Sequence, residues 1–273
     1  MPAGAVQPFW GQKTFCVLTG ASQGIGRRFA IEFGRKFAGG SVFLLLARNA
    51  QGLLETRAKV LEANPGITVV CTPSDLAKED APAFKKIIES SLSEAKVSPG
   101  DFQVAFIVHN AGSLGNVGQS VSELNEVEQW NEFLALNITS TSVLNSEFLK
   151  VFPQGSVPNR TVVNVTSLCA VQPFCSMGQY CVGKAAREMF FKVLAEEDPS
   201  LNVLSYSPGP VDTDMTVTII NNTKDVKTRQ AFIEMKEKKT IVTCEQTTEK
   251  VIQVLANKKY TSGQRVDYFD EGY

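Results

Sequence analysis

Short apolar runs alternate with longer amphipathic stretches along the whole chain. The runs are rich in Val, Leu and Ile and are bounded by turn residues, as is typical of buried strands. Strands that alternate with helices form βαβ units, and continuous apolar runs indicate strands covered on both faces. The pattern therefore predicts an α/β fold with a doubly wound parallel sheet of about seven strands and helices on both faces. The expected strands span residues 14–20, 41–48, 67–72, 103–110, 160–167, 201–209 and 264–270.

No internal repeat and no Pro/Gly/Ser-rich linker divides the sequence, so we expect a single domain over residues 1–273. The irregular region is 211–248, which is polar and charged and contains "EMKEKK", a segment suited to a solvated helix. Two interpretations of 211–248 remain open. It forms either a lid over a binding site or a charged excursion on the surface.

The charge balance argues against polyanionic partners. The chain has 27 Lys and Arg against 28 Asp and Glu, a formal net charge of -1, so no strong field attracts nucleic acid or an anionic membrane. The six cysteines lack metal-ligand spacing, and we interpret them as reduced thiols that bind no metal. The opening "MPAGAVQPFW" does not resemble a signal peptide, and no run approaches the roughly 18 apolar residues of a membrane span. These features predict a cytoplasmic protein that acts on a small molecule.

A glycine-rich segment, "TGASQGIG", follows the first expected strand and leads into a helical stretch. Gly20, Gly24 and Gly26 allow a sharp turn and a close approach of the backbone to a pyrophosphate, whose charge the start of the helix favours. An ordinary glycine-rich turn is the alternative. The strand before it and the helix after it favour a dinucleotide site of the Rossmann type.

The end of the second expected strand bears on which dinucleotide binds. A site for NAD carries an acid there, whereas this chain reads "LLLARN" and has Arg48. A guanidinium suits the 2′-phosphate of NADPH, although Arg48 could simply end the strand in water. Asp75, just past the third strand, is a candidate for the adenine amino group or for the N-cap of a helix.

Tyr180 and Lys184 lie four residues apart in "QYCVGKAAR" and share one face of a helix. Taken alone, they form either an exposed pair or a proton donor beside a cation. Taken with "TGASQGIG", "HNAG" (109–112), "LNITS" (136–140), Ser167 and "SPGPVDTDM", they resemble the short-chain dehydrogenase/reductase family over nearly the whole chain.

The resemblance implies roles for individual residues. Tyr180 donates the proton as a hydride reduces a carbonyl, Ser167 holds the carbonyl oxygen, Lys184 lies beside the tyrosine, and Asn137 supports a water relay. Because a free tyrosine has a pKa of about 10, the nearby ammonium is expected to lower the pKa of Tyr180. The cofactor-binding positions implied, besides Tyr180 and Lys184, are Gly20, Ser22, Gln23, Gly24, Ile25, Gly26, Arg48, Asn49, Asp75, Leu76, Asn110, Ala111, Gly112, Pro208, Gly209, Val211 and Thr213. His109 is expected to be a packing variant in a motif that usually reads "NNAG".

Within this family the chain is similar to reductases of pterins. The segments concerned are "HNAGSLGNVGQ", "TVVNVTSLCAVQPF", "YCVGKAAREM", "SPGPVDTDM" and "SGQRVDYFD". This similarity implies NADPH-dependent reduction of pterin side-chain carbonyls in tetrahydrobiopterin biosynthesis, by a homodimer. The substrate would be bound by Ser167, Leu168, Cys169, Tyr180, Met215 and Asp267.

The chain departs from the family at Met177, where a tryptophan is usual, and methionine defines a pocket less rigidly. Asp267 could also be an ordinary solvated aspartate of a turn. Two other functions therefore stay open: a carbonyl reductase of broad specificity, which would use the same catalytic residues, and a catalytically silent protein that binds NADPH.

Overall fold

The computed structural model describes residues 8–273, and the opening residues 1–7, part of the segment judged not to be a signal peptide, lie outside it. Seven parallel strands form one sheet in the order β3-β2-β1-β4-β5-β6-β7. The strands are β1 (Thr14–Thr19), β2 (Val42–Ala47), β3 (Thr68–Pro73), β4 (Val104–His109), β5 (Asn159–Val165), β6 (Leu201–Ser207) and β7 (Arg265–Asp267). The predicted doubly wound parallel sheet is confirmed, and its strand order reverses between β1 and β4, the place where ligands bind in such folds.

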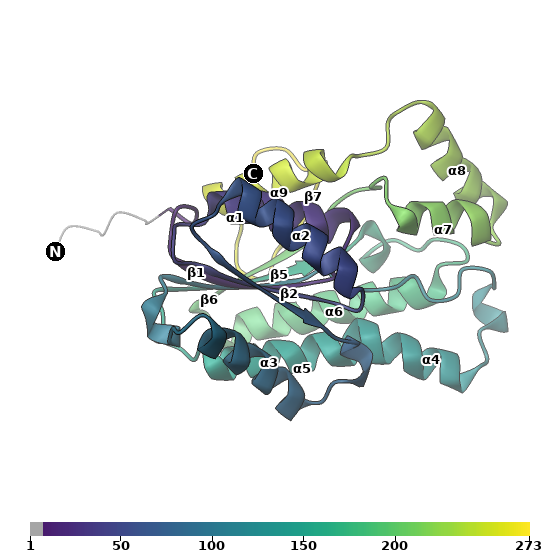
Figure 1. Ribbon diagram of the computed structural model, residues 1–273. Helices are drawn as coiled ribbons and strands as arrows, with labels where there is room; N and C mark the ends of the chain where they lie inside the picture. Colours follow the sequence, from purple (N-terminus) through teal and green to yellow (C-terminus); the bar gives the residue numbers. More distant parts are fainter. Residues whose placement is uncertain (1–7) are drawn as a thin grey trace.

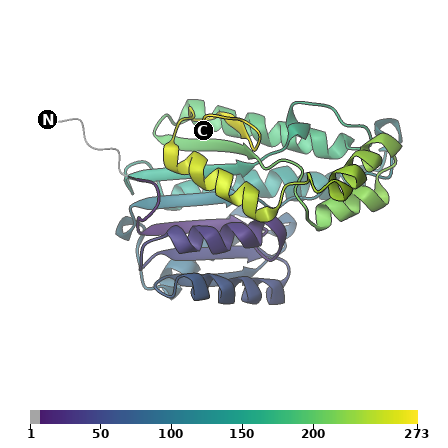
Figure 2. The same ribbon diagram turned by 90° about the horizontal axis from the view of Figure 1, so that it is seen from above.

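Helices cover both faces of the sheet (Figures 1 and 2). One face carries α1 (Gly24–Lys36), α2 (Ala50–Ala63) and α9 (Cys244–Asn257), and the other carries α3 (Ala81–Glu94), α5 (Ser140–Val151) and α6 (Gly178–Glu197). Short 3₁₀ turns lie at Leu76–Lys78, Pro99–Asp101, Val121–Glu123 and Leu168–Ala170.

Alternation along the strands explains the two cores. In β1, Cys16 and Leu18 point to the α1 side, where they join Phe29 and Phe33, while Phe15 and Val17 point to the α3 side. All six residues of β1 are buried, which is why the strand reads as a continuous apolar run instead of an alternating one.

A continuous helical stretch runs through α4 (Val127–Leu134), a π-helical turn (Ala135–Thr139) and α5. The π turn adds one residue to the local helical repeat and rotates the side chains that follow it. It carries Asn137, one of the predicted site residues, into the buried interior.

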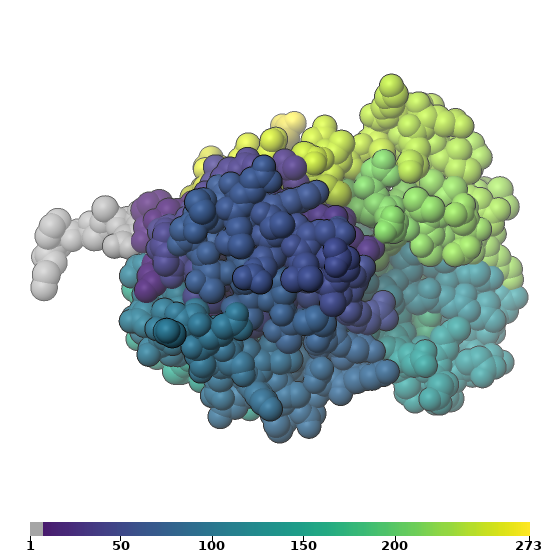
Figure 3. Space-filling model, viewed as in Figure 1, coloured from purple at the N-terminus to yellow at the C-terminus, as the bar shows by residue number. Residues whose placement is uncertain are grey.

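The irregular region 211–248 forms α7 (Asp214–Asn222), α8 (Val226–Glu237) and the first turn of α9. α7 and α8 stand out from one end of the molecule (Figures 1 and 3). A parallel bridge between Val211 and Val242 closes the base of this excursion. The predicted boundary at Thr248 is too late, because Thr247 and Thr248 are fully buried with α9 against the main core.

The seventh strand is also shorter than predicted, ending at Asp267 in a turn instead of continuing to residue 270. No helix between residues 8 and 273 combines the length and the apolar composition needed to cross a bilayer.

Candidate active site

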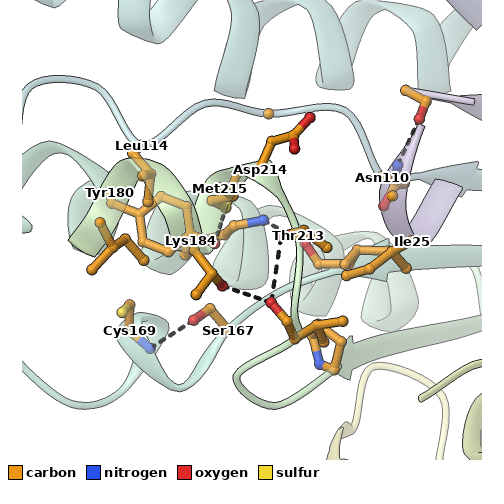
Figure 4. A pocket seen from close by; sticks show the side chains of 18 of the residues that line it. Ile25, Asn110, Leu114, Ser167, Cys169, Tyr180, Lys184, Thr213, Asp214 and Met215 are labelled. Carbon is orange, nitrogen blue, oxygen red and sulfur yellow. Dashed lines mark hydrogen bonds between the residues drawn. The ribbon is translucent and has the colours of Figure 1, made fainter. Parts of the chain in front are cut away.

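A cavity of about 1090 Å³ opens along the carboxyl ends of the strands. Its walls are the segments that follow each strand, together with α7 and α8. Parallel strands bring all their carboxyl ends to one edge, so residues distant in sequence meet there. Figure 4 shows Ile25, Asn110, Ser167, Tyr180 and Thr213 gathered around this space.

The glycine-rich loop after β1 is built for a close approach of the backbone to a ligand. Gly20 has a φ of +68°, which a side chain would strain, and a Cβ at Gly26 would lie 2.1 Å from the Gly20 carbonyl oxygen. Asn110 holds the loop from the neighbouring strand, donating from Nδ2 to the carbonyls of Thr19 (3.0 Å) and Gly20 (3.2 Å). This arrangement fits the diphosphate of a dinucleotide at the start of α1.

Arg48 and Asp75 line the cavity just past the ends of the neighbouring strands β2 and β3. Arg48 directly follows β2 and is exposed. Asp75 occupies the N-cap position of the turn Leu76–Lys78, but its side chain makes no capping hydrogen bond there. Both groups are therefore placed to meet a ligand, while the water-facing alternative for Arg48 stays open.

Ser167 and Tyr180 face each other at one end of the cavity (Figure 4). The Ser167 Oγ accepts a hydrogen bond from the Cys169 backbone N–H at 3.2 Å, so its own proton stays available to an oxygen in the cavity. The Tyr180 hydroxyl contacts Met215 Sδ at 3.8 Å, and the Ser167 hydroxyl is close enough to lower the pKa of the phenol. The arrangement offers two O–H donors to one carbonyl oxygen.

Burial raises the pKa of Tyr180 above its ordinary value, and the Cys169 thiol adds to the rise. The Ser167 hydroxyl and the positive charge of Arg187 lower the pKa of this phenol without cancelling the rise. The predicted decrease is therefore wrong for the structure as it stands, since desolvation of a phenolate outweighs the nearby cations.

Lys184 is buried and donates from Nζ to the Val165 carbonyl at 2.7 Å. Its ammonium lies 5.4 Å from the centroid of the Tyr180 ring. Burial and the charge of Arg187 hold the pKa of Lys184 well below its usual range. Lys184 is thus next to the phenol, as predicted, but its ammonium group loses its proton more readily than that of an exposed lysine.

Asn137 lies behind this group and does not line the cavity. Its Nδ2 donates to the Phe133 carbonyl at 3.0 Å and its Oδ1 accepts from the Ser113 backbone N–H at 3.0 Å. Asn137 is the one predicted site residue that the structure leaves outside the cavity wall; its proposed part in a water relay stays a prediction.

The predicted substrate residues line the same cavity as the glycine loop. Leu168 and Cys169 follow Ser167, Met215 lies in the first turn of α7, and Asp267 ends β7. The Asp267 carboxylate pairs with Arg265 at 2.9 Å and accepts from the Phe269 backbone N–H at 3.2 Å. Because the Asp267 side chain is only 15% exposed, Asp267 is not a solvated aspartate of a turn. Its carboxylate does stabilise the turn through the Phe269 N–H.

Five residues of α8 that the sequence interpretation missed also line the cavity: Lys227, Thr228, Ala231, Phe232 and Met235. Ala231, Phe232 and Met235 follow Thr228 by three, four and seven residues, which places these four on one face of the helix. This short apolar face was not recognised in the sequence, because Lys and Glu residues surround it and no residue of α8 is buried. The periodicity inside the charged segment was the available signal.

His109 is buried and has the packing role that was predicted. Its Nε2 lies 3.2 Å from Asn145 Oδ1, and its ring packs against Phe191 with a centroid distance of 5.2 Å. Burial and the charge of Arg187 lower the pKa of His109 to about 3, so the imidazole is neutral at physiological pH. His109 does not line the cavity. Residues 8–273 hold no cluster of three or more His, Cys, Asp or Glu suited to a metal ion.

Residues 14–224 match the family model described as short chain dehydrogenase. The chain belongs to the short-chain dehydrogenase family. It is therefore an oxidoreductase, and members of this family use a nicotinamide cofactor. The fold agrees with that of a short chain dehydrogenase from Shigella flexneri solved in complex with NADP, with a TM-score of 0.76 at 20% identity over 97% of this chain and 100% of that one.

Among curated family members, the chain is 39% identical to sepiapterin reductase from Bos taurus, over 95% of this chain and 96% of that protein. It is 26% identical to a benzil reductase, (S)-benzoin forming, from Bacillus cereus, over 93% of this chain and 99% of that protein. The similarity to sepiapterin reductases confirms the predicted resemblance to reductases of pterins.

Proposed function

We propose that this protein reduces the side-chain carbonyls of pterins, sepiapterin and 6-pyruvoyl-tetrahydropterin, with NADPH, in tetrahydrobiopterin biosynthesis. The observation that carries the proposal is that all predicted catalytic and substrate residues except Asn137 line one cavity. The sepiapterin reductases, at 35% to 39% identity over at least 93% of the chain, support the pterin substrate.

The chain's own residues perform the acid and positioning chemistry, and NADPH supplies the hydride when bound. As negative charge develops on the carbonyl oxygen, Tyr180 donates its proton and Ser167 donates a second hydrogen bond. Lys184 holds the end of β5 through the Val165 carbonyl and lies beside the phenol ring. The segments that follow the strands, together with α7 and α8, surround the reacting groups. Because they exclude water, the electrostatic interactions with the developing charge become stronger.

A steady-state assay with NADPH and sepiapterin tests the substrate, with diacetyl and benzil as competing carbonyls. We expect kcat/KM for sepiapterin to exceed that for either diketone. Turnover of the diketones at equal or greater efficiency would instead support the broad carbonyl reductase. No turnover of any carbonyl, with NADPH still bound, would support the silent binding protein.

The cofactor preference depends on Arg48, which follows β2 where an NAD site would have an acid. We expect Arg48→Asp to raise the KM for NADPH by about 10-fold or more, because a charge-assisted phosphate contact is replaced by repulsion. The KM for NADH should change little. Steady-state kinetics with both cofactors measure this, with Arg57→Asp as the control, since Arg57 is an exposed arginine of α2 outside the cavity. Equal losses for both cofactors would assign Arg48 a structural role.

The segment 211–248 acts as a lid within the single 1–273 domain under this proposal. Residues of α7 and α8 line the cavity, while the bridge between Val211 and Val242 ties the base of the segment. The protein also acts as a homodimer in this proposal, which is supported by the exposed apolar residues Val182, Met189 and Val193 along one side of α6. A cytoplasmic location stays a prediction from composition.

A further inference from the structure

Arg187 lies on α6, one turn after Lys184, and its side chain is buried, with an exposure of 1%. It donates from Nε to Asn164 Oδ1 at 2.9 Å, from one terminal nitrogen to the Ala111 carbonyl at 2.9 Å, and from the other to the His109 carbonyl at 2.6 Å. One side chain of α6 therefore ties together the ends of β4 and β5. None of these partners carries a charge.

A buried cation without an anion is costly, since hydrogen bonds to neutral acceptors recover only part of its hydration. Arg160 of β5 provides a contrast. It is 5% exposed, and it pairs with the Asp198 carboxylate at 2.6 Å. Arg187 forms no such ion pair with any carboxylate of residues 8–273. The carboxylate next to it in sequence, Glu188, pairs with Lys192 and Arg265 instead.

The position of Arg187 connects it to the reaction. Tyr180, Lys184 and Arg187 are spaced by four and three residues, so they share one face of α6. A Cβ at Gly112 would lie 3.8 Å from the Arg187 terminal nitrogen and 2.9 Å from Asn137 Oδ1. Arg187 thus supports the 109–112 loop on the side opposite the cavity.

The charged and titratable groups around the Tyr180 phenol are few. On its own helix they are Cys181, Lys184 and Arg187, and the other elements that pack here or line the cavity contribute Cys169, His109, Asp214, Lys227 and Asp267. His109 is neutral, because burial and Arg187 lower its pKa to about 3, and Lys184 is a weakened base. Arg187 is the cation whose charge lowers the pKa of Tyr180.

We propose that Arg187 is a positioning residue for carbonyl reduction, which fixes the 109–112 loop and supplies a positive charge behind the phenol of Tyr180. The inference rests on the proposed function, because it assigns proton transfer to Tyr180. It explains why a costly buried cation is kept without an anion: negative charge appears nearby only while the phenol gives up its proton. A carboxylate partner would cancel that effect.

The test compares Arg187→Met with Arg187→Lys in the holoenzyme. Removing the charge destabilises the phenolate, so the pH above which carbonyl reduction declines should move upward by on the order of one unit in Arg187→Met. Arg187→Lys keeps the charge and should keep most of the parent profile, even if the loop contacts weaken the affinity for NADPH. Arg160→Met is the matched control, since it removes a buried arginine with its own carboxylate partner, and its profile should equal that of the parent.

A second readout does not depend on turnover. A fluorinated tyrosine at position 180 has a more acidic phenol, and its fluorine NMR signal reports the pKa directly in the parent and in both Arg187 variants. We expect the same upward shift in Arg187→Met and not in Arg187→Lys. If Arg187→Met does not fold, Arg187→Gln replaces it, because its amide still donates to a carbonyl of the 109–112 loop.

Unchanged profiles and unchanged phenol titration in the charge-free variants would overturn the inference and leave Arg187 a structural tie. Equal shifts in Arg160→Met would overturn it as well, by assigning the effect to general loosening of the core. Failure of the parent to reduce any carbonyl would refute the proposed function instead, and the fluorine titration would still decide whether Arg187 acts on the phenol.

Discussion

Replacing Tyr180 with phenylalanine is expected to lower kcat for carbonyl reduction by at least about 10²-fold, the usual contribution of a general acid. The substitution removes one oxygen, which contacts Met215 Sδ at 3.8 Å, and keeps the ring. The fold and the affinity for NADPH should therefore survive. Single-turnover kinetics with NADPH in excess measure the chemical step directly.

Tyr206→Phe is the matched control for this experiment. Tyr206 is also a buried tyrosine, but its hydroxyl bonds to the Thr247 carbonyl at 2.9 Å in the core and not to the cavity. We expect this variant to lose about 1 kcal/mol of unfolding free energy and to keep its kcat. Activity of Tyr180→Phe within a few-fold of the parent would refute the assignment of the acid.

Ser167 and Tyr180 illustrate what sequence can predict about this site. Ser167 comes just after a strand, and Tyr180 forms a helical i, i+4 pair with Lys184. Because the carboxyl ends of parallel strands share one edge of the sheet, residues with such patterns are expected to meet there. The glycine loop was also predictable, since Gly20 has a positive φ and a Cβ at Gly26 would clash with the Gly20 carbonyl oxygen. Local rules and the topology of the sheet are enough for such residues.

The pKa of Tyr180 could not be predicted in this way. The sequence places Lys184 beside the phenol, but only the structure shows how deeply both are buried and that Lys184 Nζ is bonded to the Val165 carbonyl. Burial is a property of the whole packing, and here it outweighs the pairwise charge effect. The influence of Arg187 was missed for the same reason.

The structure of the segment 211–248 was predicted only in outline. Charged residues around Phe232 and Met235 made α8 look solvated, and its apolar stripe is too narrow to dominate the pattern. The end of the segment was misplaced because Thr247 and Thr248 are polar residues buried by helix packing. Side chains whose burial is decided by tertiary contacts leave little trace in a hydropathy pattern.

Asp267 stabilises a turn, and the proposed function also assigns it to pterin binding, so an experiment must separate the two. Its carboxylate accepts from the Phe269 backbone N–H and pairs with Arg265, yet it also lines the cavity. A carboxylate has about four acceptor sites, so these contacts leave capacity for the adjacent N–H donors of a pterin ring. Asp267→Ala would disturb both roles at once and cannot distinguish them.

Asp267→Asn does distinguish them, because the amide oxygen can still accept from Phe269 while the amide N–H₂ would face the N–H donors of the pterin. We expect kcat/KM for sepiapterin to fall by about 10- to 100-fold, the effect of losing a charge-assisted hydrogen bond, with NADPH affinity unchanged. Diacetyl, which is too small to reach from Tyr180 to a ring anchor, should lose little, since remote binding energy positions only the larger substrate. Asp198→Asn, which weakens an ion pair with Arg160 outside the cavity, controls for loss of a paired carboxylate. Parallel losses on sepiapterin and diacetyl would mean that Asp267 supports the fold, and unchanged sepiapterin kinetics would remove Asp267 from the pterin site.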